Sequence, residues 1–133
     1  MFLVDSSVWV AAVMPQHPQH VQVERFLRVG PPLMVLDLTL YEVANVVARN
    51  YGELDVARRL VQGLFRGSSR PPLQADATLF EHGLDLMSQH RLTAYDAAYV
   101  AAARCHGWQL VSLDVRHLVS KGLAVTPDAA DYP

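Results

Sequence analysis

Short apolar runs alternate with helical patterns along this chain, and that alternation constrains its fold more than any other feature. The runs Phe2–Val4, Leu33–Leu36 and Trp108–Leu113 predict buried strands, with shorter ones at Leu73–Ala75 and Leu123–Val125. Apolar periodicity predicts helices over Ser6–Met14, Pro18–Arg28, from Thr39 onwards, Glu53–Phe65, Asp76–Gln89 and Thr93–His106. Strands that alternate with helices predict an α/β fold, in which a mainly parallel central sheet is flanked by helices on both faces.

The length of 133 residues, with 51% hydrophobic and 18% charged residues, suits one folded domain over residues 1–133. Two cores of about 65 residues each would be marginal. Residues Gly67–Pro72 are too short to separate two domains and are expected to form a loop. Residues 128–133 are expected to be a frayed tail.

Charge and cysteine content exclude several classes of protein. A net charge of -2 excludes a protein that is held to nucleic acid by bulk charge alone. The single cysteine, Cys105, excludes an internal disulfide framework and a zinc site built from cysteines. The apolar start of the chain contains Asp5 and no basic leader, and no apolar run approaches the ~18 residues of a membrane span. We therefore expect a soluble, cytoplasmic protein without a signal peptide.

Four acidic residues stand where strands end or helices begin. Asp5 and Asp114 each follow a predicted strand, where aspartate commonly caps the next helix. Glu42 follows Thr39, and Asp96 follows Thr93, at the spacing of a capping box. Taken singly, each acid is explained by helix capping.

Taken together, the four acids favour a metal site. The carboxyl ends of parallel strands meet at one edge of a sheet, where ligands bind, and Asp5, Glu42 and Asp114 are expected at this edge. Asp96 also begins a helix, although no clear strand directly precedes it. Carboxylates that converge there raise one another's pKa unless a cation neutralises them, and an all-oxygen ligand set suits Mg²⁺ or Mn²⁺.

Four motifs carry a family resemblance that covers nearly the whole chain. In order and spacing they resemble the motifs of PIN domains, and more narrowly those of the VapC ribonuclease toxins of prokaryotic toxin–antitoxin pairs. The segments are Val4-Asp5-Ser6-Ser7-Val8-Trp9, Tyr41-Glu42-Val43-Ala44-Asn45, the block from Thr93-Ala94-Tyr95-Asp96 to Ala103, and Leu110-Val111-Ser112-Leu113-Asp114.

The resemblance implies a Mg²⁺-dependent endoribonuclease whose metal-binding and catalytic acids are Asp5, Glu42, Asp96 and Asp114. A metal ion at these acids would lower the pKa of a bound water, which would then attack the RNA phosphorus in line. Glu42 would either bind the metal or act as a base. Whether one metal or two is bound stays open.

Five further residues are candidates for supporting roles. Ser7 and Ser112 would orient the carboxylates by hydrogen bonds, and Asn45 would lie on the same helical face as Glu42. Arg49 and Arg116 are candidates for contacts with RNA, with solvated helix surface as the equal alternative.

The resemblance also implies partners: an RNA substrate, a second copy of the chain in a homodimer, and a cognate antitoxin that inserts a segment across the active-site groove. The segment from Arg49 to Arg70 contains five arginines and two acidic residues, Glu53 and Asp55. These arginines would bind RNA, face an acidic partner or simply be solvated. His17 and His20 stand three residues apart, but Pro18 and the lack of a third ligand favour surface residues. The alternative function is a non-catalytic PIN-like module that binds RNA or a protein.

Overall fold

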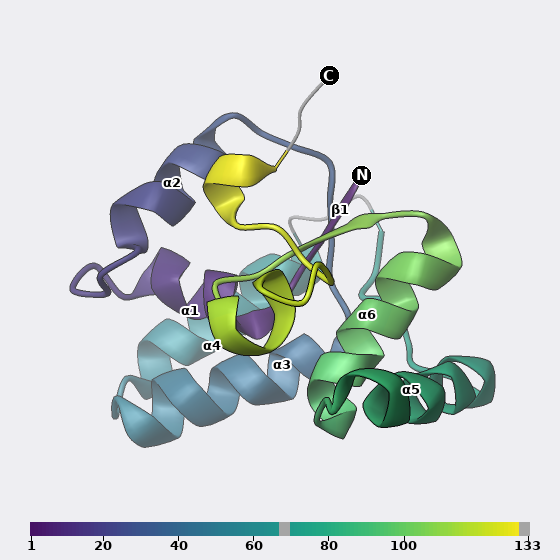
Figure 1. Cartoon of the computed structure of the whole chain (residues 1–133). Coiled ribbons are helices and arrows are strands. Elements are labelled where there is room, and N and C mark those ends of the chain that lie inside the picture. Colours follow the sequence, from purple (N-terminus) through teal and green to yellow (C-terminus); the bar gives the residue numbers. More distant parts are fainter. Residues whose placement is uncertain (67–69, 131–133) are drawn as a thin grey trace.

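The central feature of the fold is a small parallel sheet in which the first strand lies in the middle (Figure 1). The structure is a computed structural model and describes residues 1–66 and 70–130. Strand β1 (Phe2–Val4) pairs in parallel with β2 (Leu33–Met34) on one side and with β3 (Gln109–Val111) on the other. Two isolated parallel bridges, Leu36–Leu73 and Val111–Val125, extend this arrangement. The predicted parallel sheet is confirmed, but the two predicted short strands form only these bridges.

The alternation of side chains along the strands divides the core into two layers. Leu3 and Leu110 point into a cluster formed with α5 (Ala77–His90) and α6 (Ala94–His106). Phe2 and Val4 point the other way, into a cluster with α1 (Ser6–Val13) and α2 (His20–Arg28). Figure 1 shows these two helical pairs on opposite sides of β1. The expected α/β fold with helices on both faces is therefore confirmed.

A third cluster extends the molecule beyond the sheet. Helix α3 (Asp37–Val43) runs directly into η1 (Ala44–Asn50), a segment with the wider turn of a π-helix, and α4 (Leu54–Arg66) packs back against it. Val43, Val47 and Ala57 from these elements pack on Val10 and Met14 of α1. This cluster fixes the position of Glu42, near the end of α3, relative to α1.

Several helix boundaries differ from the sequence prediction. The second helix begins at His20, because residues 15–19 form turns and not a first helical turn around Pro18. Helix α3 begins at Asp37, whose carboxylate accepts the N–H of Leu38 and of Ala75. Thr39 therefore lies inside the helix, and the predicted capping box of Thr39 and Glu42 is wrong. The predicted caps Asp5, Thr93 and Asp114 are confirmed.

The end of the described chain is more ordered than expected. After β3 come η2 (Val115–Val119), which has a π-helical turn, and η3 (Pro127–Ala129), a 3₁₀ turn. Ala130 is buried in the cluster with α1 and α2, so the prediction of a frayed tail is wrong for residues 128–130. Residues 131–133 of that tail and 67–69 of the predicted loop lie outside the described residues. None of the helices in the described parts of the chain combines the length and the hydropathy that a membrane span requires.

Helices α5 and α6 both end on a residue with left-handed backbone geometry, and this gives a matched pair of stability predictions. Arg91 ends α5 with φ 55°, whereas Gly107 ends α6 with φ 66°. A side chain disfavours this conformation by about 1 kcal/mol relative to glycine. Arg91→Gly should therefore raise the free energy of unfolding by about 1 kcal/mol, and Gly107→Ala should lower it by about the same amount. Thermal or urea unfolding measures both, and changes of the same sign would contradict this account.

Candidate active site

Asp5 is the buried anchor of the candidate site. It follows β1 and caps α1, where its Oδ1 atom accepts the backbone N–H of Ser7 at 3.0 Å and of Val8 at 3.4 Å. Only 5% of the residue is exposed. Burial raises the pKa of Asp5 to about 6, although hydrogen bonds from Ser112, Ser7 and Val8 oppose the rise.

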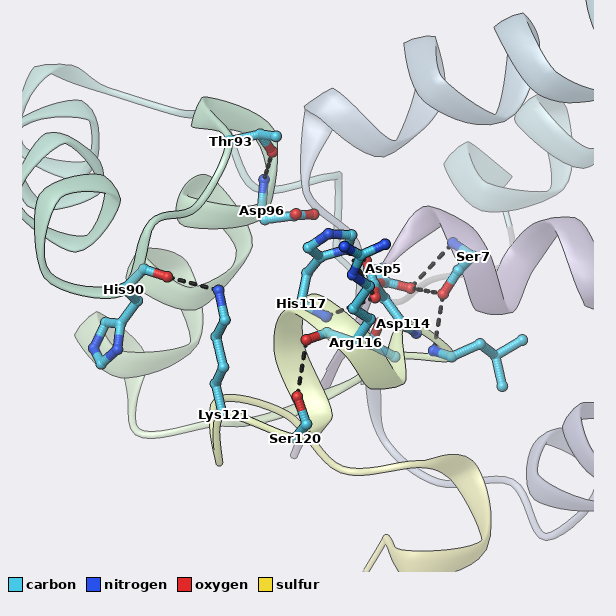
Figure 2. Close-up of polar contacts among 12 residues, drawn as sticks. Asp5, Ser7, His90, Thr93, Asp96, Asp114, Arg116, His117, Ser120 and Lys121 are labelled. Atoms are coloured by element: carbon cyan, nitrogen blue, oxygen red, sulfur yellow. Dashed lines mark hydrogen bonds and ion pairs between the residues drawn. The ribbon is translucent and has the colours of Figure 1, made fainter.

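Two serines tie the end of β1 to the end of β3. The Ser7 hydroxyl donates to Asp5 Oδ1 and accepts the N–H of Leu113 at 2.9 Å (Figure 2). Ser112 is fully buried, and its hydroxyl accepts the N–H of Asp114 at 3.0 Å and hydrogen-bonds with Asp5. Both serines therefore contact Asp5 directly, and their role in orienting the acids for catalysis stays a prediction.

Glu42 reaches the site from α3 and is held by the Tyr99 hydroxyl, which in turn is hydrogen-bonded to Thr39. The Tyr99 hydroxyl donates to Glu42 Oε1 at 2.7 Å, and Thr39 Oγ1 lies 2.8 Å from the same hydroxyl. Because a phenol has one proton to give, Thr39 is the donor in the second bond. Burial raises the pKa of Glu42, and nearby Asp96 raises it further, against hydrogen bonds from Tyr99 and Ser6. Burial also raises the pKa of Tyr99, and the Glu42 charge adds to this rise, so Tyr99 stays a donor.

Asp96 lies in the first turn of α6, where Thr93 Oγ1 accepts its backbone N–H at 3.1 Å. Figure 2 shows its carboxylate pointing toward the region of Asp114 and His117. Burial raises the pKa of Asp96, and the Asp114 charge raises it further. The charges of His117 and Lys121 act in the opposite direction.

Asp114 caps the η2 turn and pairs with a histidine in it. Its Oδ1 atom accepts the N–H of His117 at 2.9 Å, and its Oδ2 atom lies 3.1 Å from His117 Nδ1. Lys121 follows η2 and donates to the carbonyl oxygen of His90 at 2.7 Å, where α5 ends. His117 was not among the site residues predicted from the sequence. The signal that could have found it is its spacing of three residues from a capping aspartate.

The four predicted acids are electrostatic neighbours. The charge of Glu42 raises the pKa of Asp5, and the charge of Asp96 raises the pKa of Glu42. The charge of Asp114 in turn raises the pKa of Asp96. Within residues 1–66 and 70–130, however, no three His, Cys, Asp or Glu side chains already stand as a metal-ligand set. Their donor chemistry still fits a hard divalent cation, because carboxylate oxygens predominate and mutual repulsion would be relieved by positive charge. The carboxylates would have to turn toward such an ion to bind it together.

The remaining predicted residues lie outside this hydrogen-bonded group. Asn45 and Arg49 are exposed on η1, and Arg116 is exposed on η2. Over the described residues no hydrogen bond joins Asn45 to any of the four acids. A supporting role for Asn45, and RNA contacts for Arg49 and Arg116, stay predictions.

Comparison with known proteins identifies the family. The model of the PIN domain matches residues 2–121. Ribonuclease VapC3 of Pyrobaculum aerophilum is 34% identical over 130 residues, which cover 94% of this chain and 98% of that protein. The chain therefore belongs to the PIN-domain family, and within it is similar to VapC.

Solved structures agree on the fold. The crystal structure of Mycobacterium tuberculosis VapC20, described as a toxin that cleaves the sarcin-ricin loop, has a TM-score of 0.79 at 21% identity. The match covers 92% of this chain and 95% of the VapC20 chain. A toxin–antitoxin complex from Klebsiella pneumoniae has a TM-score of 0.72 at 19% identity, with 96% of this chain and 98% of that chain covered.

The raised pKa of Asp5 predicts how stability depends on pH. Between pH about 4 and about 6 the folded protein holds a proton that the unfolded chain has released, so stability falls as pH rises through this window. Asp5→Asn keeps a capping oxygen but removes the buried charge. The metal-free variant should be more stable than the wild type by roughly 2–3 kcal/mol at pH 8, and this difference should disappear toward pH 4. Urea unfolding in EDTA at both pH values measures it, and a difference independent of pH would contradict the assignment.

The bridging role of Ser7 gives a second prediction for this site. Ser7→Ala removes the acceptor of the Leu113 N–H and a donor to Asp5, so it should lower the free energy of unfolding by about 1–3 kcal/mol. Ser120→Ala is the matched control, because that hydroxyl donates to the Arg116 carbonyl at the surface. Its effect should stay within about 0.5 kcal/mol. Equal losses in the two variants, measured by urea unfolding, would show that Ser7 does not tie the strands together.

Proposed function

We propose that this chain is a metal-dependent endoribonuclease, the toxin of a VapBC-type toxin–antitoxin pair. The observation that carries the proposal is the group of four coupled carboxylates, Asp5, Glu42, Asp96 and Asp114, at the carboxyl end of the sheet in a PIN domain. The name of the Pyrobaculum relative, a ribonuclease, supports the same activity.

The acids divide into those that would hold a cation and one suited to move a proton. Asp5, Asp96 and Asp114 would hold Mg²⁺ or Mn²⁺, which supplies Lewis-acid stabilisation of charge on the phosphate when bound. Ser7 and Ser112 keep Asp5 oriented by hydrogen bonds. Because the pKa of Glu42 is raised, its carboxylate is a better proton acceptor than an ordinary glutamate.

Residues next to Glu42 and Asp114 would orient the carboxylate and bind the phosphate of the RNA. Tyr99 donates to Oε1 of Glu42 and so fixes the orientation of the carboxylate. His117 lies beside Asp114 on an exposed turn, where a ring N–H would meet a phosphate oxygen of the RNA. Arg116 on the same turn would add a second phosphate contact.

The proposal extends to partners and place of action. A cognate antitoxin is proposed because a structural neighbour is a toxin–antitoxin complex. A homodimer in the cytoplasm is proposed from the family resemblance. Light scattering tests the dimer, which should have about twice the 14.8 kDa mass of one chain.

Cleavage of a panel of structured RNAs tests the activity. The wild type should cut with Mg²⁺ and not in EDTA, and Asp96→Asn should reduce the rate by at least about 100-fold, because it removes a charge from the metal-binding group. Asp85→Asn, a change of an exposed carboxylate on α5, is the matched control and should retain the wild-type rate.

Equal cleavage by the wild type and Asp96→Asn would refute the assignment of this site. Thermal unfolding gives a second readout, because Mg²⁺ should stabilise the wild type and Asp85→Asn but not Asp96→Asn. A protein that neither cuts RNA nor responds to Mg²⁺ would be a binding module and not a nuclease.

A further inference from the structure

A pocket lies directly beside the candidate active site. Ser7 and Asp114 form the edge that the pocket shares with the acidic group. From there it extends between α1, the turn that precedes α2 and the end of η1, as an open pocket with a volume of about 420 Å³. That volume is within the range of small-ligand pockets in proteins. An RNA strand with a phosphate at the carboxylates would therefore have a neighbouring nucleotide at this pocket.

The lining combines apolar walls with one aromatic ring. Val10, Val46 and Leu113 supply apolar surface from three different elements. Tyr51, the residue that ends η1, lines the pocket and is 46% exposed, so part of its surface is accessible to a ligand. Planar bases bind to such surfaces because each base has a face that stacks on an aromatic side chain.

Hydrogen-bonding groups stand at the far side of the pocket. The backbone N–H of Gln19 donates to His17 Nδ1 at 3.1 Å, so the neutral imidazole carries its proton on Nε2, which acts as a donor. The Gln19 side chain adds an amide with both donor and acceptor groups. Among the described residues that line the pocket, Asp114 is the one carboxylate, so charge repulsion is confined to the edge nearest the acids.

We propose that this pocket holds one unpaired base of the RNA next to the phosphate that is cut. Tyr51 stacks on the base, while His17 and Gln19 form hydrogen bonds with its edge and so contribute to sequence preference. This inference rests on the proposed ribonuclease function and adds to it the residues that select the cutting position. A flat heterocycle fits the combination of apolar walls, one ring and two polar groups at one end.

Binding of short RNAs tests the pocket without requiring cleavage. Labelled hexamers of U, C, A and G are titrated into protein that carries Asp96→Asn, with Mg²⁺ present, and fluorescence anisotropy is measured. Adding Tyr51→Ala should weaken the affinity for the tightest-binding hexamer about tenfold, as expected for the loss of one stacked base. Tyr51→Phe keeps the ring and should bind like the parent. Phe65→Ala, at an exposed aromatic residue on α4 outside the pocket, is the matched control and should change affinity less than twofold.

Gln19→Ala tests base selection separately from affinity. It should reduce the ratio of the affinities for the tightest-binding and the weakest-binding hexamer at least threefold. In the wild-type background, Gln19→Ala should also broaden the distribution of positions at which RNA is cut. Thermal unfolding of each variant shows that it is folded.

The outcomes separate this inference from the proposed function. If Tyr51→Ala and Gln19→Ala bind all four hexamers like the parent while Mg²⁺-dependent cleavage persists, the base pocket is refuted and a protein partner becomes its expected occupant. If Tyr51→Phe loses as much affinity as Tyr51→Ala, stacking is refuted. If no hexamer binds and the wild type cuts no RNA, the proposed function fails and the pocket inference fails with it.

Discussion

A carboxylate buried at the end of the central strand must be compensated by its surroundings, and much of the structure around Asp5 does this. The start of α1 supplies two backbone N–H groups, and Ser7 and Ser112 supply hydroxyl groups. The same serines accept N–H groups from Leu113 and Asp114, so they also fix the end of β3. The compensation is incomplete, since the pKa of Asp5 is still raised to about 6. The protein therefore gives up stability at neutral pH to keep a charged group where a cation would be bound.

Local sequence signals were sufficient for the features that depend on neighbours along the chain. Apolar runs located the strands because each strand is buried on both faces. The caps Asp5, Thr93 and Asp114 were recognisable because a cap contacts residues two or three positions away. Asp5, Glu42 and Asp114 were singled out together because the carboxyl ends of parallel strands share an edge, and Asp96 was added because it begins a helix within a motif that resembles the family. Their coupled pKa shifts agree with that reasoning, although Glu42 reaches the group from within a helix and not from the start of one.

Contacts between distant parts of the chain could not be predicted in the same way. Thr39 matched a capping box, but Asp37 provides an earlier helix start through its bond to Ala75, 38 residues away. Thr39 is instead buried against Tyr99, 60 residues away, where it supports the donor of Glu42. Tyr99 has the appearance of a core residue in sequence, and only its hydrogen bonds to Thr39 and Glu42 in the folded chain show that its hydroxyl serves an acid. Lys121 likewise reaches the neighbourhood of Asp96 only through the fold.

The wide turn of the π-helical segment η1 changes the helical spacing next to the site. Counting along an α-helix puts Asn45 and Arg49 on the face of Glu42, but η1 begins at Ala44, and a π-helical turn closes its hydrogen bonds five residues apart. Positions after Ala44 are therefore displaced from the α-helical stripe. Asn45 is exposed, and Val46 and Tyr51 line the pocket beside the acids. Insertions of this kind occur often at functional sites, because they redirect side chains without ending the helix. At this site Tyr51 directly follows the π-helical segment and lines the pocket, so its ring would offer the proposed base a surface next to the group that would hold the phosphate.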